Sequence, residues 1–306
     1  MRIVVHGQQA FGRSVLEKLI ERKENIVAVC TAPDKEGKPL DPLKELALEH
    51  GLTVHQPASW KTPEALELMQ SFEADVCIMA YVLLFIPQPV LDAPKLGSFQ
   101  YHPSLLPMHR GPSSINWPIA MGSTRTGLTI FWPDEGLDEG PVLLQKECDI
   151  GPDETLGDIY FKKLFPMGVD AMIESLDLLK AGKAPRIKQN LEDGSYESWF
   201  GKAQAEIDWS LPAAEVYNRI RAANPQPAAW TTLGGETLQI FDSRRADTAS
   251  GAAGSVSAID DSGILVACGD GAGILISRLR AAGGAKLGSA DFVAESGLKA
   301  GDKLGG

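Results

Sequence analysis

Apolar residues in the first third of the chain recur with alternating strand and helix spacing. A short buried strand is predicted at 2–6, and apolar residues at helical spacing from Phe11 to Ile20 predict a helix directly behind it. The alternation continues with predicted strands at 26–30, near Val54, at 75–80 and at 97–101, and with predicted helices at 42–50, 63–72 and 89–91. Repeated βαβ units predict an α/β fold with a Rossmann-like, mostly parallel, doubly wound sheet. Ligands of such sheets bind beside the carboxyl ends of the strands.

The pattern changes after this region. Strands are predicted at 128–132 and 142–147, and the acidic, glycine-rich loop 133–140 lies between them. The carboxylates of this loop make it a candidate functional segment. A long helix is predicted at 155–179, with a kink at Pro166, because proline removes an intrahelical hydrogen bond.

A second domain is predicted behind a polar linker. Residues 183–203 are rich in polar and turn residues, and Ser210 and Pro212 then provide the N-cap and first turn of a helix that ends at Arg221. Short predicted strands separated by glycine turns follow at 231–233, 236–241, 254–259, 264–268 and 273–279. We therefore predict an N-terminal domain over 1–182, a linker over 183–203, and a small, OB-like β-barrel domain over 204–306.

The charge balance disfavours polyanionic partners. The 306 residues carry a formal net charge of −11, and the part from Gln204 onward contributes −3 of it. Neither part of the chain has the basic surface of a general nucleic-acid-binding protein. No apolar run approaches the roughly 20 residues that span a bilayer, and the apolar stretch at 3–5 is too short for a signal-peptide core. We expect a cytoplasmic protein with no membrane partner.

Two sequence features carry no chemistry of their own. The four cysteines, Cys30, Cys77, Cys148 and Cys268, lie far apart and form no C-x-x-C pair, so neither a zinc site nor a disulfide framework is predicted. The opening segment Gly7 to Gly12 departs from G-x-G-x-x-G and lacks the ending of a phosphate-binding loop. Its glycines indicate a tight turn between a strand and a helix rather than a standard nucleotide site.

A histidine motif follows the predicted strand at 97–101. Gln100 and His102 are two residues apart, which places an amide and an imidazole on one face of the strand at its carboxyl end. Pro103 and Pro107 stiffen the loop behind them, and Asp138 in the acidic loop provides a second polar anchor. An imidazole, a carboxylate and an amide in this arrangement favour acyl-transfer chemistry.

Segments of this chain resemble those of a known family. The segments that match its signature most specifically are Gln100-x-His102-Pro103-Ser104-Leu105-Leu106-Pro107, Arg110-Gly111 and Gly136-Leu137-Asp138-x-Gly140. They resemble the signature of the folate-dependent formyltransferases. The likeness extends over nearly the whole chain, and segments such as Phe85-Ile86-Pro87 and Ile130-Phe131-Trp132 look most like the hydrolase domain of 10-formyltetrahydrofolate dehydrogenase. The stretches 266–271 and 289–292 resemble the barrel domain shared by that hydrolase domain and the tRNA enzymes.

The resemblance implies a reaction and a set of catalytic residues. 10-Formyltetrahydrofolate would donate its formyl group through a tetrahedral intermediate, and tetrahydrofolate would be released. His102 would transfer protons and stabilise the intermediate, Asp138 would orient His102 and an ordered water, and Gln100 would donate a hydrogen bond to the oxyanion. The transferases carry Asn at the position of Gln100 and the hydrolase branch carries an apolar residue there, so this chain departs from both.

The resemblance also implies a folate pocket and leaves the formyl acceptor open. The pocket residues would be Leu84, Phe85, Ile86, Ser104, Leu105, Leu106, Pro107 and Leu137. No metal is expected, and no nicotinamide cofactor, because no aldehyde-dehydrogenase segment follows residue 306. The acceptor would be water, an amine metabolite or a carrier-protein arm. Methionyl-tRNA is the alternative that the charge disfavours, a sugar nucleotide has no specific support, and a non-catalytic folate-binding module is the alternative of another class.

Overall fold

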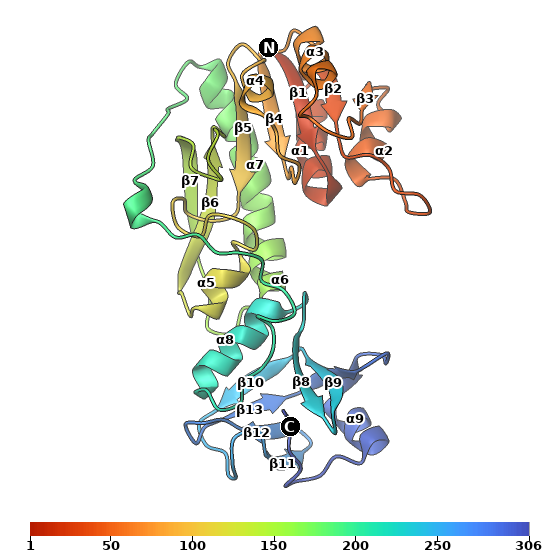
Figure 1. The fold of residues 1–306 in the computed structure, drawn as a ribbon, viewed down its shortest axis with the longest axis vertical. Coiled ribbons are helices and arrows are strands. Elements are labelled where there is room, and N and C mark those ends of the chain that lie inside the picture. Colours follow the sequence, from red (N-terminus) through yellow and green to blue (C-terminus); the bar gives the residue numbers. More distant parts are fainter. Residues whose placement is uncertain (306) are drawn as a thin grey trace. The chain divides into compact units, whose positions relative to one another are not determined.

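The computed structural model describes residues 1–305, which form two compact units (Figure 1). Unit 1 contains Met1–Gly111, Gly127–Cys148 and Lys163–Tyr196. Unit 2 contains Pro112–Thr126, Asp149–Lys162 and the segment from Glu197 onward. The chain thus enters unit 2 twice before residue 197. The domain boundaries predicted at 182 and 204 stay a prediction.

The sheet of unit 1 has seven strands in the order β3-β2-β1-β4-β5-β6-β7. The strands are β1 (Arg2–Gly7), β2 (Asn25–Cys30), β3 (Val54–His55), β4 (Val76–Ala80), β5 (Ser98–His102), β6 (Arg125–Phe131) and β7 (Val142–Asp149). Pairing is parallel from β3 through β5 and antiparallel between β5 and β6. The predicted α/β fold with a mostly parallel sheet is therefore confirmed.

Strand β4 shows why the sheet forms where it does. All five of its residues are buried, as expected for a strand covered on both faces, and it pairs with β1 on one side and β5 on the other. The strand order changes direction between β1 and β4. There a Cβ on Gly7 would lie only 2.2 Å from the Ala80 carbonyl oxygen, so only glycine permits this approach of the two strand ends.

Helices cover the faces of this sheet (Figure 1). They are α1 (Gln9–Glu21), α2 (Pro42–Glu49), α3 (Pro63–Ser71), α4 (Gln88–Leu91) and α7 (Phe165–Lys180). Local sequence starts two of them. Asp41 caps α2 by accepting a hydrogen bond from the Leu43 N–H, and Thr62 caps α3 in the same way from Ala65, each with proline at the first helical position.

Unit 2 contains two four-stranded sheets, with the strand orders β10-β13-β12-β11 and β15-β14-β9-β8. Neighbouring strands in both sheets run antiparallel. The strands are β8 (Ala229–Leu233), β9 (Glu236–Ile240), β10 (Ser243–Ala246), β11 (Val256–Asp260), β12 (Gly263–Ala267), β13 (Gly273–Ile276), β14 (Arg278–Ala281) and β15 (Leu287–Gly288). The helices are α5 (Asn116–Ala120), α6 (Leu156–Ile159), α8 (Ala213–Ala223) and α9 (Ser289–Ser296). Because β13 leads into β14 across one residue, the chain passes directly from one sheet to the other, as in a small barrel. The predicted antiparallel C-terminal domain is confirmed.

The long helix predicted at 155–179 differs in the structure. It is divided into α6, a π-helix at Tyr160–Leu164 and α7. Pro166 lies in the first turn of α7, directly behind this π-helix, so the helical segment continues past the proline and its regular hydrogen bonding is interrupted just before it. The kink expected at Pro166 stays a prediction. Sequence periodicity also missed β10, β15, α5 and α9, because segments this short or this polar carry little periodic signal.

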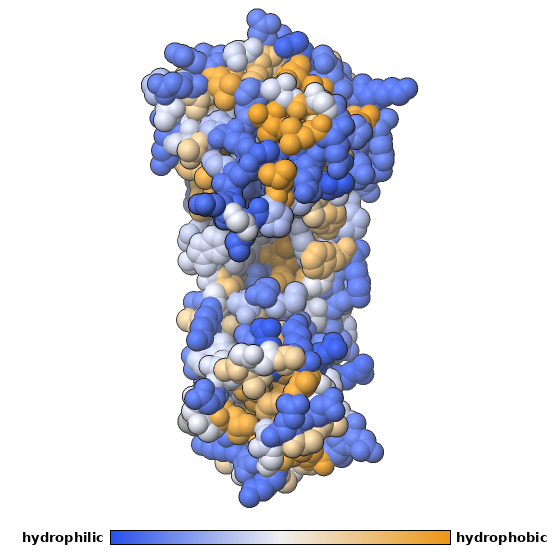
Figure 2. Space-filling model, turned by 90° about the vertical axis from the view of Figure 1, so that its right-hand side faces the viewer, coloured by the Kyte–Doolittle hydropathy of each residue, from blue (hydrophilic) through white to orange (hydrophobic). Residues whose placement is uncertain are grey.

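The surface is mostly polar. The face shown in Figure 2 is mainly hydrophilic and is interrupted by apolar patches in both units. Within residues 1–305, no helix combines the length and the apolar character needed to cross a bilayer.

Candidate functional site

Strand β5 delivers the two polar residues of the predicted site. Gln100 pairs with Met79 of β4 and Phe131 of β6, and His102 pairs with Thr129 of β6. Since side chains alternate along a strand, Gln100 and His102 lie on the same face of the sheet. His102 is the last residue of β5, so its imidazole lies at the carboxyl end of the strand, where the next loop begins.

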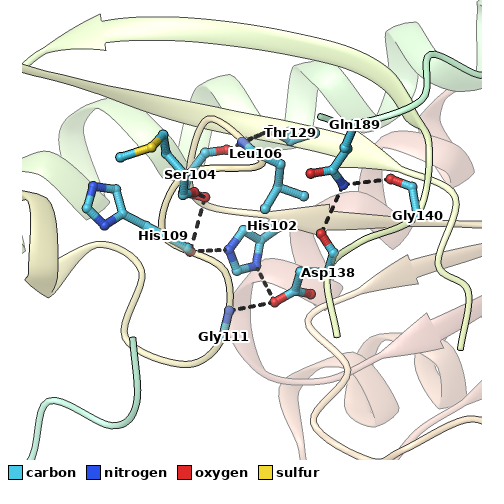
Figure 3. A network of polar contacts seen from close by, with 10 residues as sticks. His102, Ser104, Leu106, His109, Gly111, Thr129, Asp138, Gly140 and Gln189 are labelled. Atoms are coloured by element: carbon cyan, nitrogen blue, oxygen red, sulfur yellow. Dashed lines mark hydrogen bonds and ion pairs between the residues drawn. The ribbon is translucent and has the colours of Figure 1, made fainter. Parts of the chain in front are cut away.

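His102 and Asp138 point toward each other in this unit (Figure 3). The His102 Nδ1 atom lies 3.6 Å from the Asp138 Oδ2 atom, and His102 Nε2 lies 2.9 Å from the His109 carbonyl oxygen. A carbonyl only accepts, so Nε2 carries the hydrogen and donates it. The Gly111 N–H donates to Asp138 Oδ2 at 2.8 Å. Both side chains are more than nine-tenths buried.

The loop behind His102 is held by a chain of hydrogen bonds (Figure 3). Ser104 Oγ donates to the Met108 carbonyl at 2.7 Å. Thr129 Oγ1 donates to the Ser104 carbonyl at 2.7 Å and accepts from the Leu106 N–H at 3.0 Å. The Gln145 amide donates to the Leu106 carbonyl at 2.7 Å. These bonds fix the loop geometry, so the position of His102 is set before any ligand binds.

The acidic loop is fixed from the other side by a residue that sequence reasoning did not select. Gln189 donates from Nε2 to the carbonyl oxygens of Asp138 at 2.9 Å and Gly140 at 2.7 Å. Asp138 has a φ of 57°, a left-handed conformation that a non-glycine residue rarely adopts. The buried amide of Gln189 therefore helps to hold the strained backbone that aims the Asp138 carboxylate at His102.

Gln100 lies beside this network without joining it. Its side chain is half-buried and forms no hydrogen bond within residues 1–305. The amide is thus free to donate to another group. The structure does not bring Gln100 into the bonded group of His102, Asp138 and His109.

The predicted folate residues divide by exposure. Ile86, Ser104 and Leu106 are buried, and Leu105 and Pro107 are partly buried. Leu84, Phe85 and Leu137 are 38%, 60% and 56% exposed. The exposed side chains are open to a ligand, whereas the buried ones pack inside the unit.

The structure gives no sign of metal or cysteine chemistry among the described residues. No group of three or more His, Cys, Asp or Glu side chains in residues 1–305 is arranged to hold a metal ion. Cys30, Cys77 and Cys268 are buried free thiols, and burial raises the pKa of Cys77 and of Cys268 to about 12. These three therefore stay protonated at neutral pH and pack as small apolar residues.

Two family models match this chain. The model described as formyl transferase matches residues 1–176, and the model described as formyl transferase, C-terminal domain, matches residues 200–297. The chain belongs to the formyl transferase family. The predicted family resemblance is thereby confirmed, and so is the prediction of an enzyme at the level of the family.

Relatives of this chain carry two kinds of name. The cytosolic 10-formyltetrahydrofolate dehydrogenases of Xenopus tropicalis and Homo sapiens are 43% and 40% identical to it over 248 residues. Those matches cover 79% of this chain but only 27% of each dehydrogenase. The methionyl-tRNA formyltransferase of Trichlorobacter lovleyi is 37% identical over 308 residues, which cover 99% of this chain and 96% of that protein.

Solved structures share the fold of this chain. HypX from Aquifex aeolicus in complex with tetrahydrofolic acid has a TM-score of 0.67 at 21% identity, covering 96% of this chain and 47% of that one. The N-formyltransferase from Helicobacter canadensis, in complex with folinic acid and dTDP-3-aminofucose, has a TM-score of 0.69 at 17% identity. It covers 90% of this chain and 98% of that one.

Proposed function

We propose that this chain removes the formyl group of 10-formyltetrahydrofolate and transfers it to water, releasing tetrahydrofolate and formate. The observation that carries the proposal is the buried approach of His102 to Asp138 at the carboxyl end of β5. Similarity to proteins named 10-formyltetrahydrofolate dehydrogenase, and to solved proteins that hold tetrahydrofolic acid or folinic acid, supports the folate donor.

The folate would lie on the exposed apolar loops of unit 1. Leu84 and Phe85 follow β4, and Leu137 precedes Asp138 in the acidic loop. A flat pterin ring gains free energy when it covers such side chains, at about 25 cal/mol per Å² of apolar surface removed from water. The formyl group would then lie near the His102 imidazole.

The two ring nitrogens of His102 would have different roles in the proposed reaction, because only one of them is hydrogen-bonded to a backbone carbonyl. Because Nε2–H donates to the His109 carbonyl, Nδ1 is the nitrogen that takes up and returns a proton. The 3.6 Å separation from Asp138 is longer than a direct hydrogen bond. A water molecule can therefore donate a hydrogen bond to each of the two groups. Asp138, already held by the Gly111 N–H, orients this water and stabilises the charge on a protonated imidazole.

The reaction then balances without a metal or an oxidant. The oxygen of water bonds to the formyl carbon, and the water proton passes through His102. The carbonyl oxygen becomes an oxyanion that the Gln100 amide and His102 stabilise. The proton is delivered to N10 of the folate, the bond between carbon and N10 breaks, and formate and tetrahydrofolate leave.

The choice of acceptor is tested with the unmodified enzyme. The chain is incubated with 10-formyltetrahydrofolate, with and without initiator methionyl-tRNA, and formate and tetrahydrofolate are quantified. We expect equal amounts of formate and tetrahydrofolate in the absence of tRNA. Turnover that occurs only when the tRNA is present would contradict water as acceptor.

Methionyl-tRNA is the second candidate acceptor. The observation that favours it is the methionyl-tRNA formyltransferase match over 99% of this chain. Against it stands the net charge of −11, because an acidic protein repels the phosphate backbone of tRNA. The charge supports water as the leading acceptor, and the same assay distinguishes the two. A non-catalytic folate-binding module would release neither product.

A further inference from the structure

Unit 2 contains a cavity of about 500 Å³ whose lining residues all belong to that unit. The lining residues come from α6 and the segment before it, from α8 and the residue after it, from β10 and the connection before it, from the turn before β12, and from β13 and the residue after it. A cavity of this size is in the range of small-molecule sites. His102 and Asp138 belong to unit 1, so the cavity shares no residue with the site described above.

The carboxylates that line the cavity already have partners. Asp153 accepts a hydrogen bond from the Tyr217 hydroxyl at 2.8 Å, and burial raises the pKa of Tyr217 to about 12. The hydroxyl is therefore protonated at neutral pH. Asp158 pairs with Lys162 at 2.6 Å, which lowers the pKa of Asp158 to about 2.

A third acid, Asp242, lies at the mouth of the same cavity. Its carboxylate is 3.5 Å from an Arg278 guanidinium nitrogen and 3.5 Å from the Asn224 amide. Asp158 and Asp242 thus each face a cation of the protein, whereas the partner of Asp153 is a neutral hydroxyl.

The cationic side chains are less well satisfied. Arg221 is 5% exposed, and its guanidinium donates only to neutral oxygens: the carbonyls of Gly151 and Glu154 and the side-chain amide of Asn218. Asp153 and Glu154 influence its pKa only at longer range, and its Nε–H is buried without a partner. A buried guanidinium that lacks a carboxylate partner is costly, so an anionic ligand is favoured beside it.

Two residues at the start of β10, Ser243 and Arg244, also have side-chain groups without a partner among the described residues. The Arg244 guanidinium forms no hydrogen bond or ion pair with residues 1–305. The Ser243 hydroxyl is buried and has no hydrogen-bond partner among them. Buried polar atoms in proteins nearly always have partners, and two residues that line this cavity, Arg221 and Ser243, each have one buried polar atom without a partner in the described part of the chain.

We propose that this cavity binds a small, hydroxyl-bearing phosphate ester, of the size of a sugar phosphate. Arg221 and Arg244 supply two positive charges, which match the charge of a phosphate monoester, and guanidinium groups bind phosphate oxygens with paired hydrogen bonds. The side chains of Phe241 and Leu275 contribute an apolar wall for its carbon skeleton. The proposal does not depend on the function proposed for unit 1.

Calorimetric titration of the full chain with ribose-5-phosphate tests the proposal. Ribose and inorganic phosphate are titrated in parallel at constant ionic strength. We expect saturable binding of ribose-5-phosphate, weaker binding of phosphate, and none of ribose. Arg244→Ala should weaken binding by about tenfold or more, the loss of one charge-assisted hydrogen bond of at least about 1.4 kcal/mol.

Arg245→Ala provides the matched control. Arg245 is the next residue of β10, is exposed, and does not line the cavity, so the variant has the same net charge as Arg244→Ala. It should bind ribose-5-phosphate within about twofold of the unmodified chain. Thermal unfolding checks that every variant is folded.

Three results would overturn the proposal. The first is the absence of saturable binding of ribose-5-phosphate. The second is an equal loss of affinity in Arg244→Ala and Arg245→Ala, which would indicate general charge attraction. The third is binding of inorganic phosphate as tight as that of the ester, which would show that the cavity does not recognise a carbon skeleton.

Discussion

His102 is the residue on which the proposed chemistry depends most. Its Nε2–H is fixed to a backbone carbonyl and its Nδ1 faces the Asp138 carboxylate, so the ring has one orientation and one exchangeable position. The motif around it could be predicted from the sequence, because strand alternation places Gln100 and His102 on one face. The contact with Asp138, 36 positions away, was implied only by the family resemblance.

Replacement of His102 tests its role. His102→Ala should lower kcat for 10-formyltetrahydrofolate hydrolysis by roughly 10²–10⁴-fold, the usual contribution of a general acid–base group, while the fold is kept. His50→Ala, at an exposed position just after α2, is the control and should turn over at the rate of the unmodified chain. Steady-state kinetics and circular dichroism measure both effects. Equal rates for His102→Ala and the unmodified chain would refute the assignment.

Because His6 is buried, we expect the stability of the folded chain to depend on pH. This histidine is buried in β1 beside Trp60, and burial lowers its pKa to about 3. It stays neutral in the folded chain but takes up a proton near pH 6.5 when unfolded. The unfolded state therefore binds more protons, and stability is lost as the pH falls below about 6.5, by up to about 1.4 kcal/mol per pH unit.

Chemical denaturation at pH 7, 6 and 5 measures this dependence. His6→Gln should lose less unfolding free energy on acidification than the unmodified chain does, because its side chain does not titrate. His50→Gln replaces an exposed histidine and should follow the unmodified chain. If His6→Gln and the unmodified chain lost stability in parallel, His6 would not be responsible.

At the scale of elements, the acidic loop shows where sequence reasoning ends. The loop and Asp138 could be predicted from composition and family resemblance, but Gln189 could not. Its two acceptors lie 51 and 49 positions away, and no periodic pattern connects a polar connecting segment to a loop at that distance. The strands of unit 1 were predictable for the opposite reason, since continuous burial leaves a local apolar run.

The two hydrogen bonds that Gln189 donates to the acidic loop lead to a separate prediction. Gln189→Leu removes both hydrogen bonds to the loop, so we expect kcat to fall by about tenfold or more with KM for the folate little changed, because the loss affects the aim of Asp138. Gln56→Leu is the matched control. Gln56 donates to the Ala32 carbonyl in another part of unit 1 and should leave kcat unchanged. A rise in KM alone, with kcat intact, would show that Gln189 supports folate binding instead.

At the scale of the whole molecule, charge and similarity point to different acceptors. The chain carries −11 overall, yet a methionyl-tRNA formyltransferase matches nearly its full length. The fold itself cannot decide, since one fold supports many reactions. Water and an amine differ in the atom that bonds to the formyl carbon. Hydrolysis is therefore tested by following the formyl group itself.

Hydrolysis in water enriched in a heavy oxygen isotope tests that claim most directly. The chain is given 10-formyltetrahydrofolate without any other acceptor, and the released formate is analysed by mass spectrometry. If water attacks the formyl carbon, each formate carries one oxygen from the labelled solvent, and the His102→Ala variant releases little labelled formate. Unlabelled formate, or release of tetrahydrofolate without formate, would contradict the account.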